Sequence, residues 1–432
     1  MIIHIDGDAF FASCEVAQNE ALRGKPVVAG AERGIALAVT YEAKKYGVSR
    51  GMLMSEIRKL CPQVIITMLH YDTYAIYAKR MYAIVRRHAP VVEEYSIDEC
   101  FGDLTHMTEN HPSPTLPMEK DRATPPIPRR GLRGGDNPAI EAALNIKRDL
   151  EQDLGLTFSI GIAPTKVLAK VASKWNKPAG FTVLEQKDIP LFLKDIPVGK
   201  IWGIGPASSA DLMKLNVRTA LEFAQKPEWW IREHLSKPYV EIWHELNGRS
   251  VLRVSEEVRE MQKSIMKTGT FRPITKDQNI LIAELSKNAE RACRKLRDNH
   301  CITHDVYFYL KTQKFTYRSA DFRLSLGTSN PMDIVDQIQK HFHKVYSPHY
   351  DYRATGVVFR AISPATTFQP DLFGFTQEVE DRGEIFSVID ELSHKFGKGI
   401  VTLARSILSK RHDKKQTISY PDLGIPCWGE AH

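Results

Sequence analysis

The chain opens with Ile2-Ile3-His4-Ile5-Asp6-Gly7-Asp8-Ala9-Phe10-Phe11-Ala12-Ser13-Cys14-Glu15, a short apolar run followed by two aspartates and a second apolar segment. Its apolar start, bounded by turn-forming residues, is typical of a buried strand. Asp8 then stands where a helix N-cap is expected, ahead of an apolar helical segment. The sequence therefore predicts a strand followed directly by a helix, with the Asp6 carboxylate leaving the sheet at the strand end.

Outward from this stretch, strand and helix patterns alternate, which predicts an α/β or α+β first domain. We expect strands at residues 25–29, 35–39 and 157–162, two strands around a tight turn within 91–104, and helices at 41–46, 54–60, 71–88, 139–154 and 166–175. Further on, the pattern indicates helices only at 188–246, a polar linker at 250–262, mixed strand and helix to 362, and an amphipathic helix near 384–396.

One segment of the first half breaks the pattern. Residues 106–138 hold seven prolines and three glycines in 33 residues, without an apolar period. Such a segment cannot bury enough surface to fold, so we interpret it as a flexible insertion.

The composition limits the class of protein. A length of 432 residues predicts three or four domains, and 43% apolar with 26% charged residues is ordinary for a globular protein. The six cysteines are scattered without a CxxC pair, which argues against a zinc site or a disulfide framework and fits a reducing cytoplasm. The start lacks a signal-peptide pattern. The sequence contains no run of 18 apolar residues, so we expect no membrane span.

The positive charge is concentrated in one stretch. Residues 264–360 contain 16 Lys and Arg against nine Asp and Glu, an excess of seven that equals the net charge of the whole chain. Concentrated positive charge favours a polyanionic partner, although a solvated lysine-rich surface remains the alternative.

The acidic residues indicate a chemistry. Nucleotidyl transfer uses carboxylates that hold two divalent ions about 4 Å apart, and Mg²⁺ takes such hard oxygen ligands. Asp6 lies at a strand end, and a tight turn would let the adjacent Asp98 and Glu99 converge beside it instead of pointing to opposite faces. Each group alone has an ordinary explanation, as a turn former or a solvated pair.

Several motifs, in order along the chain, carry a resemblance to a known family. The segments His4–Glu15 and Tyr95-Ser96-Ile97-Asp98-Glu99 resemble the two metal-binding motifs of Y-family translesion DNA polymerases of the DinB branch. The family's fingers domain is similar to three segments here: Arg23-Gly24-Lys25-Pro26-Val27-Val28, Tyr41-Glu42-Ala43-Lys44 and Gly51-Met52. Its last palm motif is similar to Ser159-Ile160-Gly161-Ile162-Ala163-Pro164-Thr165-Lys166-Val167-Leu168-Ala169-Lys170.

The resemblance implies an α+β multidomain fold in the form of a right-hand polymerase. Its parts would be a palm (1–11 and 71–172, with the insertion 106–138), fingers (12–70), a helical thumb (173–249), a linker (250–263), a little finger (264–362) and a C-terminal tail (363–432). The implied activity is template-directed extension of a primer with deoxynucleotides during damage bypass, by a monomer in the bacterial cytoplasm.

The resemblance also implies site residues. Asp6, Asp98, Glu99 and the Gly7 carbonyl would hold two Mg²⁺ ions. Phe11 would be the steric gate, a ring under the sugar that clashes with a 2′-hydroxyl, unless it is simply a core aromatic. The nucleotide-binding residues would be Phe10, Phe11, Tyr41, Lys44 and Lys166.

Two positions depart from the family pattern and bear on nucleotide affinity. Many members have Arg where Lys44 stands, so a bidentate phosphate contact is lost. Ala38 stands where a hydroxyl often faces the triphosphate, and whether Thr40 compensates is open.

The remaining predicted contacts are with DNA and a clamp. Ile201-Trp202-Gly203-Ile204-Gly205-Pro206 resembles a helix-hairpin-helix, in which Gly203 and Gly205 let the backbone approach a phosphate. In the little finger we expect DNA contacts from Lys311, Lys314, Arg318 and Arg323. Gln369-Pro370-Asp371-Leu372-Phe373 resembles the bacterial sliding-clamp motif, with Gln369, Leu372 and Phe373 as its anchors, or is an ordinary loop.

Two other functions share part of this pattern. A palm-fold nucleotide cyclase would have paired acids but no use for the hairpin or the basic domain. A non-catalytic DNA-binding relative would keep those parts and lose the acids. Primer extension separates the three.

Overall fold

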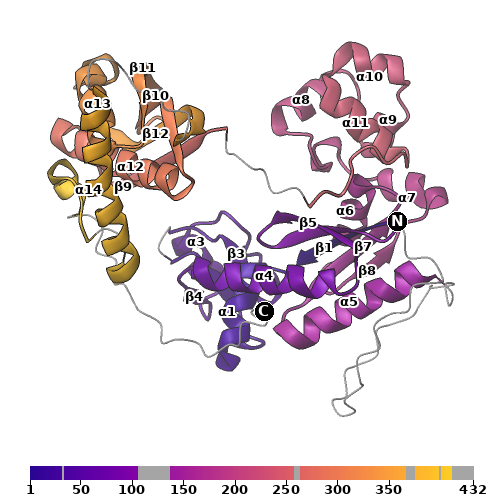
Figure 1. Ribbon diagram of the computed structural model, residues 1–432. Coiled ribbons are helices and arrows are strands. Elements are labelled where there is room, and N and C mark those ends of the chain that lie inside the picture. Colours follow the sequence, from indigo (N-terminus) through magenta and orange to yellow (C-terminus); the bar gives the residue numbers. More distant parts are fainter. Residues whose placement is uncertain (32–33, 106–136, 257–262, 366–374, 398–399, 411–432) are drawn as a thin grey trace. The chain divides into compact units, whose positions relative to one another are not determined.

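The computed structural model describes residues 1–31, 34–105, 137–256, 263–365, 375–397 and 400–410 (Figure 1). The chain divides into two compact units, Met1–Val258 with two sheets and Arg259–His432 with one. Both units combine helices with a mostly antiparallel sheet, so the α+β architecture expected from the sequence is confirmed. No helix among the described residues is long and apolar enough to cross a bilayer.

A five-stranded sheet in the order β5-β6-β1-β7-β8 forms the centre of the first unit. Strand β1 (Ile2–Gly7) lies in the middle and pairs antiparallel with β6 (Glu99–Asp103) and β7 (Phe158–Ala163). The outer strands are β5 (Val91–Ser96) and β8 (Phe181–Val183). The predicted strand from the opening residues and the two strands around a tight turn are therefore confirmed.

Helices cover both faces of this sheet. Helices α4 (Tyr71–Arg86) and α5 (Pro138–Leu154) pack on the face that carries Ile3 and Ile5 (Figure 1). Helix α6 (Lys166–Trp175) packs on the opposite face, to which the alternate positions of β1 point because side chains alternate along a strand. The site residues in β1 therefore share the α6 face.

A smaller three-stranded sheet in the order β3-β2-β4 makes the predicted fingers region. Its elements are α1 (Phe10–Gln18), η1 (Glu20–Leu22), β2 (Val27–Ala29), β3 (Ala38–Val39), α2 (Tyr41–Lys44), α3 (Met54–Leu60) and β4 (Ile65–Thr67). The strands β2 and β3 are shorter than predicted, and β4 was not predicted. Three residues are too few for an alternating pattern to show, and β4 exists because β2 pairs with it.

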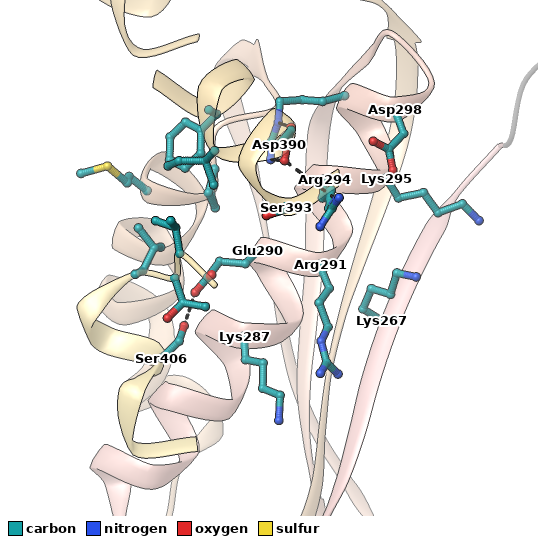
Figure 2. Close-up of a pocket in the computed structure, with 18 of the residues that line it drawn as sticks. Lys267, Lys287, Glu290, Arg291, Arg294, Lys295, Asp298, Asp390, Ser393 and Ser406 are labelled. Atoms are coloured by element: carbon teal, nitrogen blue, oxygen red, sulfur yellow. Dashed lines mark hydrogen bonds and ion pairs between the residues drawn. The ribbon is translucent and has the colours of Figure 1, made fainter. Parts of the chain in front are cut away.

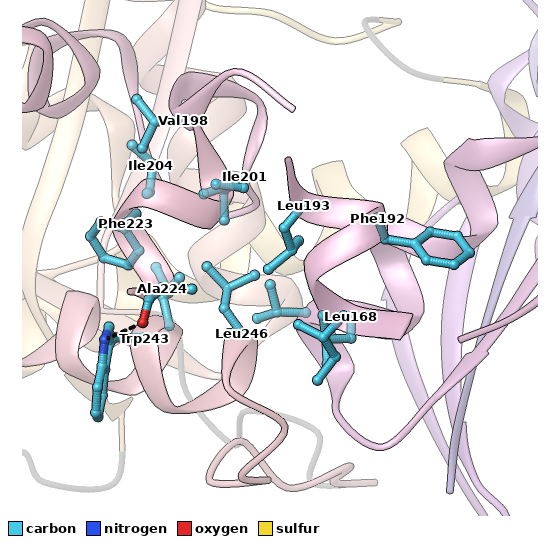
Figure 3. Close-up of a cluster of buried hydrophobic side chains, with 14 of the residues drawn as sticks. Leu168, Phe192, Leu193, Val198, Ile201, Ile204, Phe223, Ala224, Trp243 and Leu246 are labelled. Carbon is cyan, nitrogen blue, oxygen red and sulfur yellow. Dashed lines mark hydrogen bonds between the residues drawn. The ribbon is translucent and has the colours of Figure 1, made fainter. Parts of the chain in front are cut away.

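The predicted thumb is helical, as expected. It contains η3 (Gln186–Asp188), α7 (Ile189–Leu193), η4 (Val198–Lys200), α8 (Pro206–Lys214), α9 (Ala220–Ala224), α10 (Glu228–His234) and α11 (Lys237–Leu246). Its apolar side chains form one cluster with those of α6, in which Leu168 lies near Leu193 and Leu246 (Figure 3). Palm and thumb therefore share a core.

The boundary between palm and thumb differs from the prediction. Strand β8 lies within residues 173–249, assigned to the thumb, yet it pairs with β7 in parallel. The sheet thus continues to Val183. The sequence could not show this, because β8 has only three residues and its strand character comes from pairing with a distant segment.

The predicted linker is partly bound to the first unit. The Val251 and Leu252 amides donate to Glu245 Oε1 at 2.7 and 2.9 Å, and Glu256 Oε1 accepts from the Val92 amide at 3.1 Å. Glu245 is fully buried, and its Oε2 also accepts from the Val167 amide at the start of α6. Residues 251–256 are therefore part of the unit's structure.

The second unit, predicted as the little finger, has a four-stranded antiparallel sheet in the order β11-β10-β12-β9. The strands are β9 (Ile265–Thr275), β10 (Cys301–Thr312), β11 (Tyr317–Thr328) and β12 (Tyr352–Pro364), and the helices are α12 (Gln278–Asp298) and α13 (Pro331–Val345). Both helices pack on the sheet face that carries Val306, Phe308 and Leu310, which leaves the other face open.

The C-terminal elements pack on α12. They are α14 (Phe375–Phe396), η6 (Ala404–Ser406) and α15 (Ile407–Lys410). Arg297 binds both carboxylate oxygens of Asp390 at 2.6 and 3.0 Å, which fixes α14 to α12. The groove of about 1030 Å³ between these elements is lined by apolar side chains and by basic ones such as Arg291 and Lys295 (Figure 2). The predicted helix near 384–396 is confirmed and begins earlier.

Candidate active site and nucleic-acid interface

Two of the three predicted metal ligands meet directly across the sheet. The register pairs Asp6 with Glu99 of β6 on one side and with Ser159 of β7 on the other. Residues opposite each other in neighbouring strands point to the same face. The carboxylates of Asp6 and Glu99 therefore lie together on the α6 face.

A cation holds each of these carboxylates. Lys177 Nζ lies 2.5 Å from Asp6 Oδ1, and Lys170 Nζ lies 2.8 Å from Glu99 Oε1. His4 Nε2 lies 3.1 Å from Glu99 Oε2, and its Nδ1 lies 2.8 Å from Ser173 Oγ in α6.

The electrostatics differ between the two carboxylates. Burial raises the pKa of Asp6, and Lys177 only partly offsets this. Burial alone would also raise the pKa of Glu99, but the hydrogen bonds from His4 and Lys170 outweigh it and lower this pKa to about 2. Burial lowers the pKa of His4 in turn. Glu99 is therefore the more firmly ionised group, whereas Asp6 depends on a nearby cation.

Asp98 lies in the turn between β5 and β6, beside the end of β1. Its backbone oxygen accepts the Gly7 amide at 2.8 Å, which holds the turn against β1. Its carboxylate accepts a hydrogen bond from the Ser96 hydroxyl. The turn predicted for this segment is confirmed, but the Asp98 carboxylate is turned toward Ser96.

The donor set fits a hard divalent cation. Within the described residues no three acidic, histidine or cysteine side chains converge as a ready-formed metal site. The ammonium of Lys177 lies at hydrogen-bonding distance from Asp6 and 3.3 Å from Asp8 Oδ1, so a cation already stands among these oxygens. Carboxylates held in this way match the ligands that Mg²⁺ prefers.

Asp8 does not cap the first helix, contrary to the expectation. The N-cap of α1 is Ala9, with φ +49°, and no side chain caps it. Asp8 is instead buried, and its oxygens accept from the Ser159 hydroxyl at 2.8 Å and the Ala179 amide at 2.7 Å. A carboxylate directly after a strand has the sequence signature of a helix cap. Only the fold shows that it instead accepts hydrogen bonds from β7 and from the segment after α6.

Two predicted nucleotide contacts from the fingers lie beside these acids. Burial, followed by the negative charge of Asp8, raises the pKa of Tyr41. Burial, followed by Lys177, lowers the pKa of Lys44, whose Nζ lies 3.7 Å from the centre of the Tyr41 ring. Thr40 is buried and its hydroxyl accepts from the Val27 amide at 3.0 Å. The same hydroxyl accepts from the Ala43 amide at 3.4 Å, so Thr40 caps the N-terminus of α2.

Lys166 lies elsewhere. Its Nζ is bound by both oxygens of Glu93 at 2.7 and 2.8 Å and lies 4.8 Å from the centre of the Phe101 ring. A buried lysine with this bidentate partner is a structural ion pair. Of these two lysines, Lys177 and not Lys166 is therefore the one paired with Asp6 and Asp8.

Sequence reasoning missed the site's other charged partners. Lys170 and Lys177 both follow β7, and His4 stands inside the opening strand. The available signal was a spacing of four residues from Lys166 to Lys170, which places both on neighbouring turns of one helix. Lys177 precedes Pro178 in a loop, and no periodicity marks such a residue.

The two phenylalanines of the opening motif have different environments. Phe10 is 3% exposed and packs against Gly7, where a side chain would lie 2.7 Å from the Phe10 ring. Phe11 is half-buried and stacks on Tyr74, with ring centres 4.6 Å apart and an 11° angle between the planes. Only Phe11 is therefore placed to present an edge or face to a ligand.

The hairpin of the thumb uses its two glycines differently. Gly203 has φ +90°, and a side chain there would lie 2.6 Å from Ile242 Cδ1, so this position requires glycine. Gly205 has an extended conformation with open space around it, and it caps α8. The neighbouring Trp202 donates to the Tyr95 hydroxyl at 2.8 Å, which joins the hairpin to β5.

The four basic residues predicted to bind DNA in the second unit do not share one face. Lys311 and Arg323 occupy positions on the open face of the sheet, since they pair with Tyr317 and Asp305. Arg318 pairs with Leu310 on the helix-covered face and donates to the Val345 carbonyl at 2.8 Å. Arg318 is therefore a structural residue.

Lys314 lies in the exposed turn between β10 and β11. Sequence reasoning missed Arg353 and Arg360, which lie over the rings of Phe315 and Tyr307 at 4.3 and 4.7 Å. The predicted clamp anchors Gln369, Leu372 and Phe373 lie outside the described residues, as does most of the insertion 106–138.

Comparisons with known proteins agree with this architecture. The model of the impB/mucB/samB family matches residues 5–174, and the model of that family's C-terminal domain matches residues 262–372. Proteins named DNA polymerase IV from Moorella thermoacetica and Desulfatibacillum aliphaticivorans are 30% and 29% identical, over 94% and 93% of this chain and 96% and 95% of theirs.

Solved structures show the same fold. A Y-family DNA polymerase chimera of Dbh and Dpo4 superposes with a TM-score of 0.65 at 20% identity, covering 84% of this chain and 99% of the chimera. An insertion ternary complex of Dbh DNA polymerase gives a TM-score of 0.50 at 22% identity, with the same coverage. The chain belongs to the impB/mucB/samB family and is a Y-family translesion DNA polymerase of the DinB type.

Proposed function

We propose that this polymerase extends a primer by two-metal nucleotidyl transfer at the end of the β1–β6 strand pair. The observation that carries this is the pairing of Asp6 with Glu99, two acids on one face whose charges are balanced by ammonium groups. When bound, two Mg²⁺ ions would supply activation of the primer 3′-hydroxyl and neutralisation of the triphosphate. Asp6, Asp98, Glu99 and the Gly7 carbonyl would hold them.

Asp98 needs only a side-chain rotation to take part. Its backbone is fixed to Gly7, so the Cα already lies next to the end of β1. The Ser96 hydroxyl that it accepts is a neutral donor, and a divalent ion is a stronger partner for a carboxylate. Loading of the site would therefore exchange this contact for a metal bond.

The nucleotide would bind on the side of the acids that faces the fingers. Tyr41, Lys44 and Lys177 surround Asp8 there, and both lysines would contact the triphosphate as compact point charges. Lys177 would release Asp6 to the metal and bind the phosphates that arrive with it. Phe11, in the first turn of α1, would lie under the sugar and exclude a 2′-hydroxyl.

The primer–template duplex would be held by backbone contacts. The hairpin at Gly203 and Gly205 would bind a phosphate through amides at the start of α8. The open face of the second sheet would contact further phosphates through Lys311, Arg323, Arg353 and Arg360. Such contacts do not depend on base sequence, which suits an enzyme that copies any template.

All of these groups come from one chain, so we expect a monomer, and we expect it in the cytoplasm beside the nucleoid.

The carboxylates provide a test with a matched control. Glu99→Gln keeps the shape of the side chain and removes its charge, so primer extension by the full chain in Mg²⁺ should fall by at least about a hundredfold. Glu93→Gln changes the same residue type in the neighbouring strand, where the carboxylate binds Lys166, and should retain extension. Equal activity of Glu99→Gln and wild type would contradict the proposed metal site.

A further inference from the structure

A buried carboxylate of α1 lies behind the ring of Phe11. Glu15, four residues after Phe11, is 9% exposed. Its Oε1 accepts a hydrogen bond from the Tyr74 hydroxyl at 2.5 Å and lies 2.8 Å from His70 Nδ1. His70 is the N-cap residue of α4 but makes no capping bond with its side chain, which contacts α1 instead. Glu15 therefore ties α1 to the start of α4.

Tyr74 connects this carboxylate to Phe11. The Tyr74 ring is fully buried, so it cannot touch a nucleotide. Its hydroxyl is fixed at Glu15, and its face carries the stacked ring of Phe11 at 4.6 Å. Tyr71 makes edge contacts with both rings, with its ring centre 5.6 Å from that of Phe11 and 5.9 Å from that of Tyr74. The plane of the Phe11 ring thus follows the plane of Tyr74.

The proposed chemistry gives this arrangement a use. A 2′-hydroxyl differs from hydrogen by one atom, so a ring that rejects it must be placed to within a few tenths of an ångström of its working position. A half-buried phenylalanine on a short helix can change rotamer unless its neighbours prevent it. A carboxylate at Glu15 would be costly to bury without the donors Tyr74 and His70, which indicates that the network is maintained as a whole.

We propose that Glu15 is a positioning residue for sugar selection: by holding the Tyr74 hydroxyl it fixes the plane on which Phe11 stacks, and so sets how strongly ribonucleotides are rejected. This inference rests on the proposed role of Phe11 as the steric gate. Neither Glu15 nor Tyr74 contacts substrate, and both act through the Phe11 ring.

The test compares insertion of a deoxynucleotide with insertion of the matching ribonucleotide opposite one template base, as a ratio of kcat/KM values. Tyr74→Phe keeps the ring and removes the hydroxyl, and Glu15→Ala removes the acceptor. Each should lower the ratio by about tenfold, which corresponds to about 1.4 kcal/mol. Glu15→Gln retains an acceptor oxygen and should keep most of the discrimination. Tyr77→Phe, which removes a hydroxyl from the same helix, should leave the ratio at the wild-type value.

Phe11→Ala tests the steric gate separately from its positioning by Glu15 and Tyr74. If Phe11→Ala relaxes sugar selection while Tyr74→Phe and Glu15→Ala keep the wild-type ratio, the gate stands and the positioning role is wrong. If Phe11→Ala leaves the ratio unchanged, the gate itself is wrong and the positioning role with it. A loss of stability alone would lower both insertion rates together, so the ratio reports positioning even for a variant with a lower melting temperature.

Discussion

At the end of the first unit's five-stranded sheet the carboxylates of Asp6 and Glu99 are paired with defined cations, whereas on the open face of the second unit's sheet basic side chains lie over aromatic rings. Lys177 Nζ lies 2.5 Å from Asp6 Oδ1, and Lys170 Nζ lies 2.8 Å from Glu99 Oε1. Lys311, by contrast, lies 5.0 and 4.7 Å from the centres of the Phe315 and Tyr317 rings.

This contrast indicates that function depends on a few residues in the first region and is shared among many in the second. A short, partly buried ion pair depends on one geometry, so removing one partner leaves the other uncompensated. A cation–π contact depends only weakly on geometry. If one such cation is removed, neighbouring cations can still bind the phosphate backbone. Single substitutions should therefore reduce primer extension strongly in the first region. In the second region they should lower the affinity for DNA only in part.

The largest expected effect is at Asp98. Asp98→Ala should reduce primer extension by about a thousandfold or more, because the substitution removes a metal ligand. The affinity for primer–template DNA should stay within about twofold of wild type, since the duplex contacts lie in other elements. Parallel extension and equilibrium binding assays check both. Loss of binding together with extension would remove the contrast between the two regions.

A smaller effect is expected at Lys177, with Lys166 as its comparison. Lys177→Ala should raise the KM for the incoming nucleotide about tenfold to a hundredfold, since hydrogen bonds to charged groups are worth about 1.5–3 kcal/mol. Lys166→Met should leave that KM unchanged and lower the melting temperature, because the buried Lys166 pairs with Glu93. Steady-state kinetics and thermal unfolding distinguish the two lysines. A raised KM for Lys166→Met would restore the assignment that the palm motif suggested.

Substitutions on the open face should change how the affinity for DNA depends on the salt concentration. If this face and the hairpin neutralise about five phosphates, log affinity for DNA should fall against log salt with a slope of about −4 to −5. The double variant Lys311→Ala, Arg360→Ala should make this slope less steep by about two. Lys340→Ala, an exposed lysine on α13 of the same unit, should leave it unchanged. Identical slopes for all three proteins would show that DNA does not bind this face.

The smallest effect on primer extension without a sliding clamp is expected from substitutions in the C-terminal tail. A clamp-bound peptide raises the local concentration of the enzyme without a new contact at the active site. Leu372→Ala with Phe373→Ala should therefore leave extension of a naked primer unchanged and remove stimulation by a loaded sliding clamp. Wild-type stimulation of this variant would make residues 369–373 an ordinary loop.

The sequence predicted the elements that have their own pattern. The opening strand, the turn at Asp98 and the helical thumb all followed from apolar periodicity and turn residues. The partners of the charges did not follow, since they come from strand register and helix packing. Asp8 had the signature of a cap and is buried against β7, and Lys177 stands in a loop without periodicity, yet it binds Asp6.

The predicted contacts in the second unit show the same limit. Period-two alternation determines that successive residues of β11 face opposite sides, but the sequence alone did not tell which side carries the helices. Arg318 was therefore grouped with Lys311 although it lies on the other face.

The carboxylate of Glu245 bears on how the first unit can be divided into fragments. It receives amides from α6 and from Val251 and Leu252, so a fragment that stops at residue 249 would leave Oε1 without these two donors. A buried acceptor that loses its donors is destabilising by about 1–3 kcal/mol, and more when it is charged. Since palm and thumb share this carboxylate and one apolar cluster, they should unfold in a single cooperative transition. A fragment that retains this cooperativity should extend at least to Glu256.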